Sequence, residues 1–367
     1  KRFKIKPINL NKSIIMAIFK KIGKRLSKAY FKEPKMTHEE WATKKVYFPS
    51  QDISPILGYF KIKFSPQYKL LFKLMDRPDV HTLFAKWASQ SGKSLFEMLI
   101  IGYRLDNEPA NVLYMQPIKD DIPKVLRLKI NPVLKCIKDL WQKFEDYIAT
   151  EGIRSKDAIK QLAGGSLVVS GSSVKERKSL TVPLLVMDEI GEFDKGAVKE
   201  ASERLKAFSK FFPKKIGVST IVHPKDEICT NFENCEAIME WRYKCPNCKD
   251  NFYPSRETFK FMTKKEFADL NNIPENEVEK SSWKKEALKN VYIECPHCKY
   301  QINNREKSNL ILSGGMDWFF IRGDENAKSF GADMNSLGSY FVELEDLAEL
   351  LIDADGSIVD LDAIYRG

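Results

Sequence analysis

The chain has 367 residues, of which 43% are hydrophobic, and its 60 Lys and Arg against 50 Asp and Glu give a net charge of +10. This length can bury a sizeable core and suggests two or three structural units. A membrane-spanning helix is excluded because no run of about 18 apolar residues occurs. The positive charge favours a polyanionic partner, although charge bears on association and not on fold.

The positive charge is concentrated at the N-terminus, where residues 1–35 contain twelve Lys or Arg and one acidic residue, Glu33. Apolar side chains recur every four positions from Ile14 to Leu26, with lysines largely opposite them. This spacing predicts a basic amphipathic helix with Ser13 as its candidate cap. Such a helix could lie on a membrane, contact DNA phosphates, dock on a partner protein or pack on this protein's own core.

A candidate phosphate-binding loop ends in Gly-Lys-Ser and lies between an expected buried strand at 80–85 and an expected apolar helix at 95–103. At such a turn, backbone N–H groups bind phosphate oxygens, a lysine reaches the β- and γ-phosphates, and a serine hydroxyl binds magnesium. Trp87 stands where the pattern G-x-x-x-x-G-K-[ST] has its first glycine, so we expect the entry to the loop to turn differently. The residues predicted to bind ATP and Mg²⁺ here are Gln90, Ser91, Gly92, Lys93 and Ser94.

A second motif is the apolar run from Leu184 to Met187, which ends in Asp188 and Glu189. Acids at the end of a buried parallel strand lie where ligands bind in α/β sheets. We expect Asp188 to hold Mg²⁺ through water, and Glu189 and Lys93 to be catalytic, with Glu189 as general base.

The alternation of strands and helices predicts an α/β fold of the P-loop NTPase class (ASCE or RecA-like), with a parallel sheet and flanking helices. The two motifs are almost a hundred residues apart, which fits a class with one further strand between them. Residues 112–115 and 166–170 are candidates for that strand, and a strand at 216–220 follows the second motif.

Two weaker signals lie near these motifs. Ser219 and Thr220 end the strand at 216–220, where a hydroxyl could sense the γ-phosphate, although an ordinary polar strand end is equally compatible with them. Gln67 could pair with the adenine edge, and Tyr59 or Tyr68 could stack on the base, but a surface glutamine that opens a helix is more common.

The third feature is a pair of Cys-x-x-Cys knuckles, the first at residues 245–248 and the second at 295–298. Four thiolates from two tight turns favour a closed, structural Zn²⁺ site. A redox motif needs only one such pair, and a disulfide framework needs a secreted chain, for which we recognise no signal peptide. We expect helices at 264–271 and 282–289 in the segment between the knuckles, and a solvent-facing His297. The predicted zinc ligands are Cys245, Cys248, Cys295 and Cys298.

In order and combination, these motifs resemble the large subunit of tailed-phage terminases, in the branch with a zinc-binding insert typified by the lambda-like packaging ATPases. The resemblance runs from residues 89–94 through 164–167, 188–189, 218–220 and 241–248 to the second knuckle, Trp318 and residues 336–339. It implies an ATP-driven motor that moves double-stranded DNA into a procapsid in the host cytoplasm. It also implies a small terminase subunit, a portal and a homo-oligomeric ring as partners, with Thr220 in a coupling motif and Gln67 near adenine.

The resemblance has two departures. Many relatives carry an arginine where this chain has Ser89, so we expect the transition-state cation to come from Lys86, Arg177, Arg204 or a neighbouring subunit. The family also usually carries a C-terminal nuclease, and we expect none here because only 49 residues follow Trp318. The expected units are a basic helical arm (1–50), the ATPase core (51–240), a zinc-knuckle insertion (241–305), and a C-terminal ATPase subdomain or linker (306–367).

Two other functions are compatible with the same residues. One is a different DNA-translocating or helicase-like ATPase, which DNA strand separation would favour. The other is a zinc-stabilised DNA-binding module with a degenerate phosphate-binding loop, which a failure to bind ATP would favour.

Overall fold

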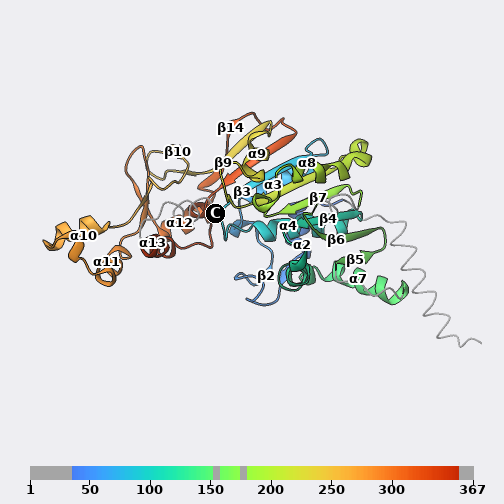
Figure 1. The fold of residues 1–367 in the computed structure, drawn as a ribbon, viewed down its shortest axis with the longest axis horizontal. Helices are drawn as coiled ribbons and strands as arrows, with labels where there is room; N and C mark the ends of the chain where they lie inside the picture. The colour runs from blue at the N-terminus through green and yellow to red at the C-terminus, as the bar shows by residue number, and fades with distance from the viewer. Residues whose placement is uncertain (1–34, 152–157, 174–179, 355–367) are drawn as a thin grey trace, which may run out of the picture. The chain divides into compact units, whose positions relative to one another are not determined.

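The computed structural model describes residues 35–151, 158–173 and 180–354. Within them, the main sheet has ten strands in the order β10-β9-β15-β3-β8-β7-β4-β6-β5, with β14 also paired to β9 (Figure 1). Its strands are β3 (Thr82–Trp87), β4 (Asn111–Gln116), β5 (Ile159–Leu162), β6 (Gly165–Gly171), β7 (Leu184–Asp188), β8 (Lys214–Ser219), β9 (Ala237–Lys244), β10 (Asn251–Phe252), β14 (Met316–Arg322) and β15 (Ser329–Met334). A separate pair is formed by β1 (Tyr47–Phe48) and β2 (Gly58–Tyr59).

The seven strands from β9 to β6 in this order are parallel to one another. This confirms the expected parallel α/β sheet. The strand between β3 and β7 is β8, which follows both motifs in the sequence. Residues 112–115 and 166–170 form strands between the two motifs in the chain, as expected; in the sheet these strands, β4 and β6, lie on the other side of β7.

Helices flank the sheet on both faces. Because successive side chains of a strand point to opposite faces, the core is divided between the two sides of the sheet. On one face, Phe84, Leu113 and Met187 pack in a cluster with residues of α8 and α9. Their neighbours Tyr114 and Asp188 point to the other face, towards α4, because successive side chains alternate. The helices of this part are α2 (His38–Lys45), α3 (Tyr68–Asp76), α4 (Lys93–Asn107), α5 (Ile122–Val125), α6 (Asn131–Lys135), α7 (Lys138–Glu151), α8 (Ala197–Ser202) and α9 (Glu227–Glu233).

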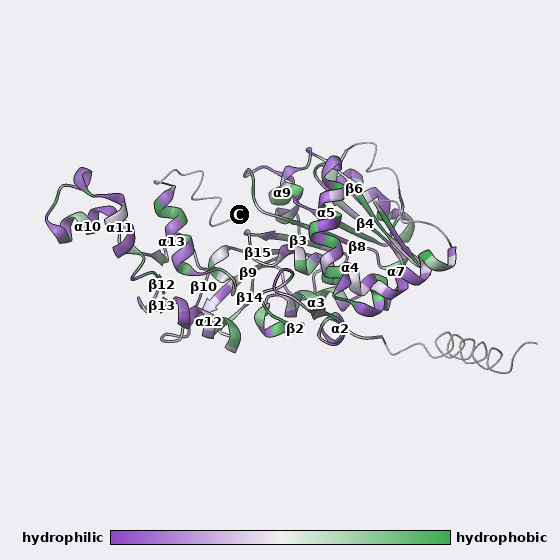
Figure 2. Cartoon of the chain, turned by 90° about the horizontal axis from the view of Figure 1, so that it is seen from below, coloured by the Kyte–Doolittle hydropathy of each residue, from purple (hydrophilic) through white to green (hydrophobic). Residues whose placement is uncertain are grey.

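The central strands are more hydrophobic than the helices between the two knuckles. Strands β4 and β6 are coloured as hydrophobic, whereas much of α10 (Lys264–Asn271) and α11 (Lys280–Ala287) is hydrophilic (Figure 2). All five residues of β7 are buried, as expected for a strand covered on both faces.

The segment between the two knuckles forms a small antiparallel sheet and two helices. The sheet has the order β11-β12-β13, and α10 begins with a capping box made by Thr263 and Glu266. Trp283 packs with Ala268, Ala287 and Ile352 of α13 in a second core. The elements are β11 (Phe259–Lys260), α10 (Lys264–Asn271), α11 (Lys280–Ala287), β12 (Tyr292–Glu294) and β13 (Gln301–Asn303), followed by α12 (Asn304–Ser313) and α13 (Leu344–Asp353).

Some expectations fall on residues outside the described ranges: the basic helix from Ser13 to Leu26, and Arg177. The last part of the expected arm, from residue 35 on, is described and contains α2. This helix packs against α3 and α4 through its buried Trp41, whose indole N–H donates to Asp106. The domain limits stay predictions. Among the described residues, no helix combines the length and the apolar character that crossing a bilayer requires.

Candidate nucleotide site and cysteine cluster

The candidate phosphate-binding loop joins the end of β3 to the start of α4. Gln90 and Gly92 both have positive φ angles, 55° and 91°. Position 92 requires glycine, because a Cβ atom there would lie 2.3 Å from the Tyr68 hydroxyl. Lys93 opens α4, and its Nζ is 3.3 Å from the carbonyl oxygen of Trp87. Ser94 follows on the first turn, so both side chains belong to the helix N-terminus that receives phosphate in this class.

Two residues at the start of α3, its N-cap Gln67 and its first residue Tyr68, brace this loop. Tyr68 donates a hydrogen bond from its hydroxyl to the Gly92 carbonyl at 2.6 Å, and Gln67 donates from Nε2 to the Ser91 carbonyl at 3.1 Å. Tyr68 is fully buried and stacks on Trp87, so its expected role in stacking on a base was wrong. Burial also raises the pKa of Tyr68. Tyr59 is 56% exposed on β2.

The packing of Tyr68 also explains the tryptophan at the first position of the loop motif. The Trp87 ring lies between Tyr68 and Trp318, with ring centroids 6.1 and 6.3 Å away. β3 continues through this residue, and the next amide, of Ala88, donates to the Met334 carbonyl. No turn is made at Trp87, so no glycine is needed there.

The two acids at the end of β7 meet the loop and β8. Glu189 has a φ of 49°, and its Oε1 lies 3.3 Å from Lys93 Nζ. Its Oε2 accepts hydrogen bonds from the Ser219 hydroxyl at 3.2 Å and from the backbone amide and hydroxyl of Thr220, both at 3.3 Å. Burial lowers the pKa of Lys93, and the Glu189 carboxylate opposes this effect. The structure therefore brings together Lys93, Glu189 and the Ser219–Thr220 pair.

Sequence reasoning missed three residues around Asp188. The Tyr114 hydroxyl donates to Asp188 Oδ2 at 2.7 Å, and Lys129 Nζ contacts the same oxygen. Lys129 Nζ is also 3.3 Å from Oε2 of Glu97, which lies one turn after Lys93 on α4. Burial and the Asp188 carboxylate raise the pKa of Glu97 well above its ordinary value. Burial disfavours the charged form of Lys129, but the carboxylates of Glu97 and Asp188 outweigh it and raise the pKa of this lysine.

A cavity of about 260 Å³ opens beside these residues. Asp188, Glu189 and Lys129 line it together with Glu192 and with polar and apolar residues from the end of β4 and the segment that follows it. The other lining residues are Gln116, Pro117, Ile118, Asp121, Lys124, Val125 and Leu128.

Of the expected sources of a transition-state cation, Lys86 faces away from α4. Its Nζ lies 2.8 Å from Asp333 Oδ2 on the neighbouring strand β15 and 4.3 Å from the ring centroid of Phe232 on α9. Arg204 lies on the 3₁₀ helix η6 (Glu203–Phe211).

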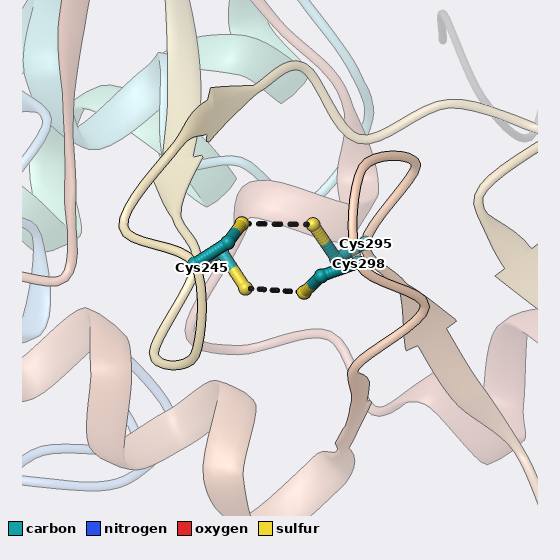
Figure 3. A group of neighbouring side chains, drawn as sticks. Cys245, Cys295 and Cys298 are labelled. Atoms are coloured by element: carbon teal, nitrogen blue, oxygen red, sulfur yellow. Dashed lines mark hydrogen bonds between the residues drawn. The ribbon is translucent and has the colours of Figure 1, made fainter.

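The four knuckle cysteines come together in two turns of the same design. In each, the backbone amide of the first cysteine donates to a carbonyl five residues on, from Cys245 to Asp250 and from Cys295 to Tyr300. The sulfurs are paired at 3.6 Å (Cys245 with Cys298) and 3.7 Å (Cys248 with Cys295) (Figure 3), and all four lie within 4.8 Å of one another. Four sulfurs placed tetrahedrally about 2.3 Å from a zinc ion would be about 3.8 Å apart. The cluster therefore fits zinc. His297 is exposed and is not among the four ligand candidates.

The loop at residues 336–339 connects the knuckle arms to the phosphate-binding loop. On β9, which leads to the first knuckle, Tyr243 donates to the Leu337 carbonyl at 2.7 Å. On α12, which follows the second knuckle, the fully buried Lys307 donates to the carbonyls of Ser339 and Val342. The Ser339 hydroxyl in turn donates to the Gln90 carbonyl at 3.1 Å.

A phosphate-binding loop between β3 and α4, and a pair of acids at the end of a parallel strand two places away, define a P-loop NTPase. The family model for the phage terminase large subunit gpA, ATPase domain, matches residues 54–318, and the chain belongs to this family. This assignment does not favour the helicase-like and DNA-binding alternatives. No curated protein sequence matched the chain significantly.

Solved structures of three phage terminases are similar to the chain. The HK97 bacteriophage large terminase is 14% identical with a TM-score of 0.41, over 54% of this chain and 40% of that one. The large terminase of a thermophilic bacteriophage is 13% identical with a TM-score of 0.32, over 47% and 41%. The ATPase domain of the Thermus phage P74-26 large terminase is 16% identical with a TM-score of 0.30, over 38% and 59%. The chain thus spans less than two thirds of each of these proteins.

Proposed function

We propose that this chain hydrolyses ATP as the motor part of a viral terminase large subunit. The observation that carries the proposal is the meeting of Lys93, Glu189 and Thr220 where β3, β7 and β8 end. These are the positions of the phosphate-binding, base and coupling groups in P-loop ATPases. Residues 90–94 would bind the phosphates of ATP, and Gln67 would support the loop near the adenine.

Magnesium would be held by Ser94 and, through water, by Asp188. The residues fit such an ion, because Asp188 Oδ1 is buried and accepts no hydrogen bond from the described residues. Magnesium, when bound, would neutralise charge on the phosphate groups. Glu189 would accept the proton of the attacking water, which requires its carboxylate to leave Lys93 free for the γ-phosphate.

The Ser219–Thr220 pair is placed to respond to changes in the hydrogen bonds that Glu189 accepts. Both residues donate to one carboxylate oxygen, and the Ser219 hydroxyl also accepts from the Gly191 amide at 3.0 Å. A change in the hydrogen bonding of Glu189 during hydrolysis would therefore move the end of β8. This is the coupling role that we propose for Thr220.

The wider assignment rests on the family. We propose that the chain works on double-stranded DNA with a small terminase subunit and a portal or procapsid, as a homo-oligomeric ring in the host cytoplasm. The four-cysteine cluster would hold one structural Zn²⁺ and so fix the two arms that meet the 336–339 loop. The unit limits proposed from the sequence, at 50, 240 and 305, are retained as part of this proposal.

The test is ATP turnover by the purified chain with magnesium, with and without duplex DNA. We expect Lys93→Ala and Glu189→Gln each to reduce turnover by at least about 100-fold, since they remove phosphate binding and the general base. Lys199→Ala, at an exposed lysine of α8, is the matched control and should leave turnover unchanged. Stimulation by duplex DNA would support the motor. Turnover that persists in both site variants, or no nucleotide binding by the unaltered chain, would refute the site.

A further inference from the structure

We propose that Lys129 and Tyr114 are positioning residues that hold one oxygen of Asp188, so that the other oxygen is presented to the magnesium of the nucleotide. This inference rests on the proposed ATPase function. It deepens that function by adding residues that belong to neither sequence motif.

Three separate elements bring these groups together. Tyr114 lies on β4 and Asp188 ends β7, and the two strands are adjacent and parallel. Their side chains share the α4 face, where the hydroxyl reaches Asp188 Oδ2 at 2.7 Å. Lys129 comes from a five-residue π-helical turn, Leu126–Ile130. Such turns are rare and are frequently found at functional sites.

The two oxygens of Asp188 have different surroundings. Oδ2 accepts from both Tyr114 and Lys129, whereas Oδ1 is buried without a hydrogen-bond partner among the described residues. The Asp188 side chain is 8% exposed, so little of this carboxylate faces bulk solvent. A buried, unpartnered carboxylate oxygen is costly unless a ligand completes it. Oδ1 is therefore the atom left for the metal shell.

Charge explains why Glu97 belongs to the arrangement. The Lys129 side chain is 22% exposed and that of Glu97 is 0% exposed, with 3.3 Å between Nζ and Oε2. A lysine this deep needs carboxylates close to it, and Glu97 supplies a second one. Bound magnesium would offset part of the negative charge of Asp188 that stabilises the Lys129 ammonium. The Glu97 carboxylate would then still keep Lys129 charged and in place.

A competing interpretation predicts the opposite effect. If Lys129 instead occupied the place of the metal, its ammonium would have to leave before magnesium could bind. Removing Lys129 would then strengthen magnesium binding. Removing a group that positions a metal ligand weakens metal affinity by about 10- to 100-fold.

The experiment measures how much magnesium strengthens nucleotide binding, without relying on turnover. ADP carrying a fluorescent methylanthraniloyl group is titrated onto the full chain with magnesium and again with a chelator. We expect Lys129→Met to reduce the magnesium-dependent gain in affinity by about 10-fold or more, with metal-free affinity changed by less than about twofold. Tyr114→Phe keeps the ring and removes only the hydroxyl, so it should reduce the gain by several-fold.

Lys199→Met is the control, because this lysine is exposed on α8, which packs on the face of the sheet away from α4. It should leave both affinities unchanged. A larger gain in Lys129→Met, or an unchanged gain in both Lys129→Met and Tyr114→Phe, would overturn the inference while leaving the ATPase assignment intact. A failure of the unaltered chain to bind ADP under either condition would overturn both. If Lys129→Met does not fold, Tyr114→Phe alone decides.

Discussion

Lys307 is a lysine with no exposed surface, and its ammonium donates to the backbone carbonyls of Ser339 and Val342. Burial lowers its pKa from 10.5 to about 8. The unfolded chain therefore binds more protons than the folded chain between these values, and the free energy of unfolding should rise with pH there. From about pH 7.5 to about pH 9.5 this one group should add about 2 kcal/mol. Urea unfolding followed by tryptophan fluorescence measures it.

The contribution of Lys307 is obtained by subtracting the pH dependence of Lys307→Met, which cannot titrate at this position. Lys265→Met, at an exposed lysine of α10, should keep the slope of the unaltered chain. Equal slopes for the unaltered chain and Lys307→Met would mean that the pKa of Lys307 is not lowered in the folded chain.

At this scale the sequence predicted the residues that belong to short, contiguous patterns. Lys93, Asp188 and Glu189 were singled out as candidates because phosphate and metal chemistry favours such spacing within one turn or strand end. Tyr114 and Lys129 were not found, because they reach Asp188 from other elements and no local spacing relates them to it. The buried Glu97 offered one signal, a charged residue on the apolar stripe of a helix, four residues after Lys93.

The two knuckles are elements whose stability should depend on the metal. Each is a short turn held by few backbone hydrogen bonds, so thiolate ligation would supply much of its order. Stripping the metal with a strong chelator, or Cys248→Ser, should remove amide-exchange protection at 245–250 and 295–300 but leave β4 and β7 protected. One zinc per chain should be measured beforehand by elemental analysis.

Cys229→Ser is the control for this loss, because Cys229 is a thiol outside the cluster. It should retain the metal and the protection. Unchanged exchange at the knuckles after the metal has gone would show that packing alone orders them.

Elements were easier to predict than their arrangement. Residues 264–271 form the expected helix with the expected limits, since a capping box and apolar spacing are local properties. The strands at 112–115, 166–170 and 184–188 were also found. The position of β8 between β3 and β7 was not, because the order of strands depends on long-range pairing and crossovers that no local pattern contains.

The whole molecule should depend on a second copy for fast hydrolysis. The described lysines next to the acids, Lys93 and Lys129, are both paired with carboxylates. A cation from a neighbouring subunit can raise phosphoryl-transfer rates about 1,000-fold or more. Turnover per chain should therefore rise with protein concentration.

Mixing experiments check this prediction. Adding inactive Lys93→Ala chains to unaltered chains at constant total concentration should reduce turnover more than in proportion if subunits act on one another. A strictly proportional loss, with turnover per chain independent of concentration, would mean that each chain supplies its own cation.

The strand β9 links the sheet to the first knuckle without a break. It pairs with β15 at residues 237–240 and ends at Lys244, immediately before Cys245, while β14 stiffens most of its length. Eight residues at about 3.3 Å each make a rod of roughly 26 Å. A tilt of about 5° at its sheet end would displace its tip by about 2 Å, by the geometry of such a rod. β9 is thus a lever arm, and its length amplifies at the cysteines any rotation that begins beside β15.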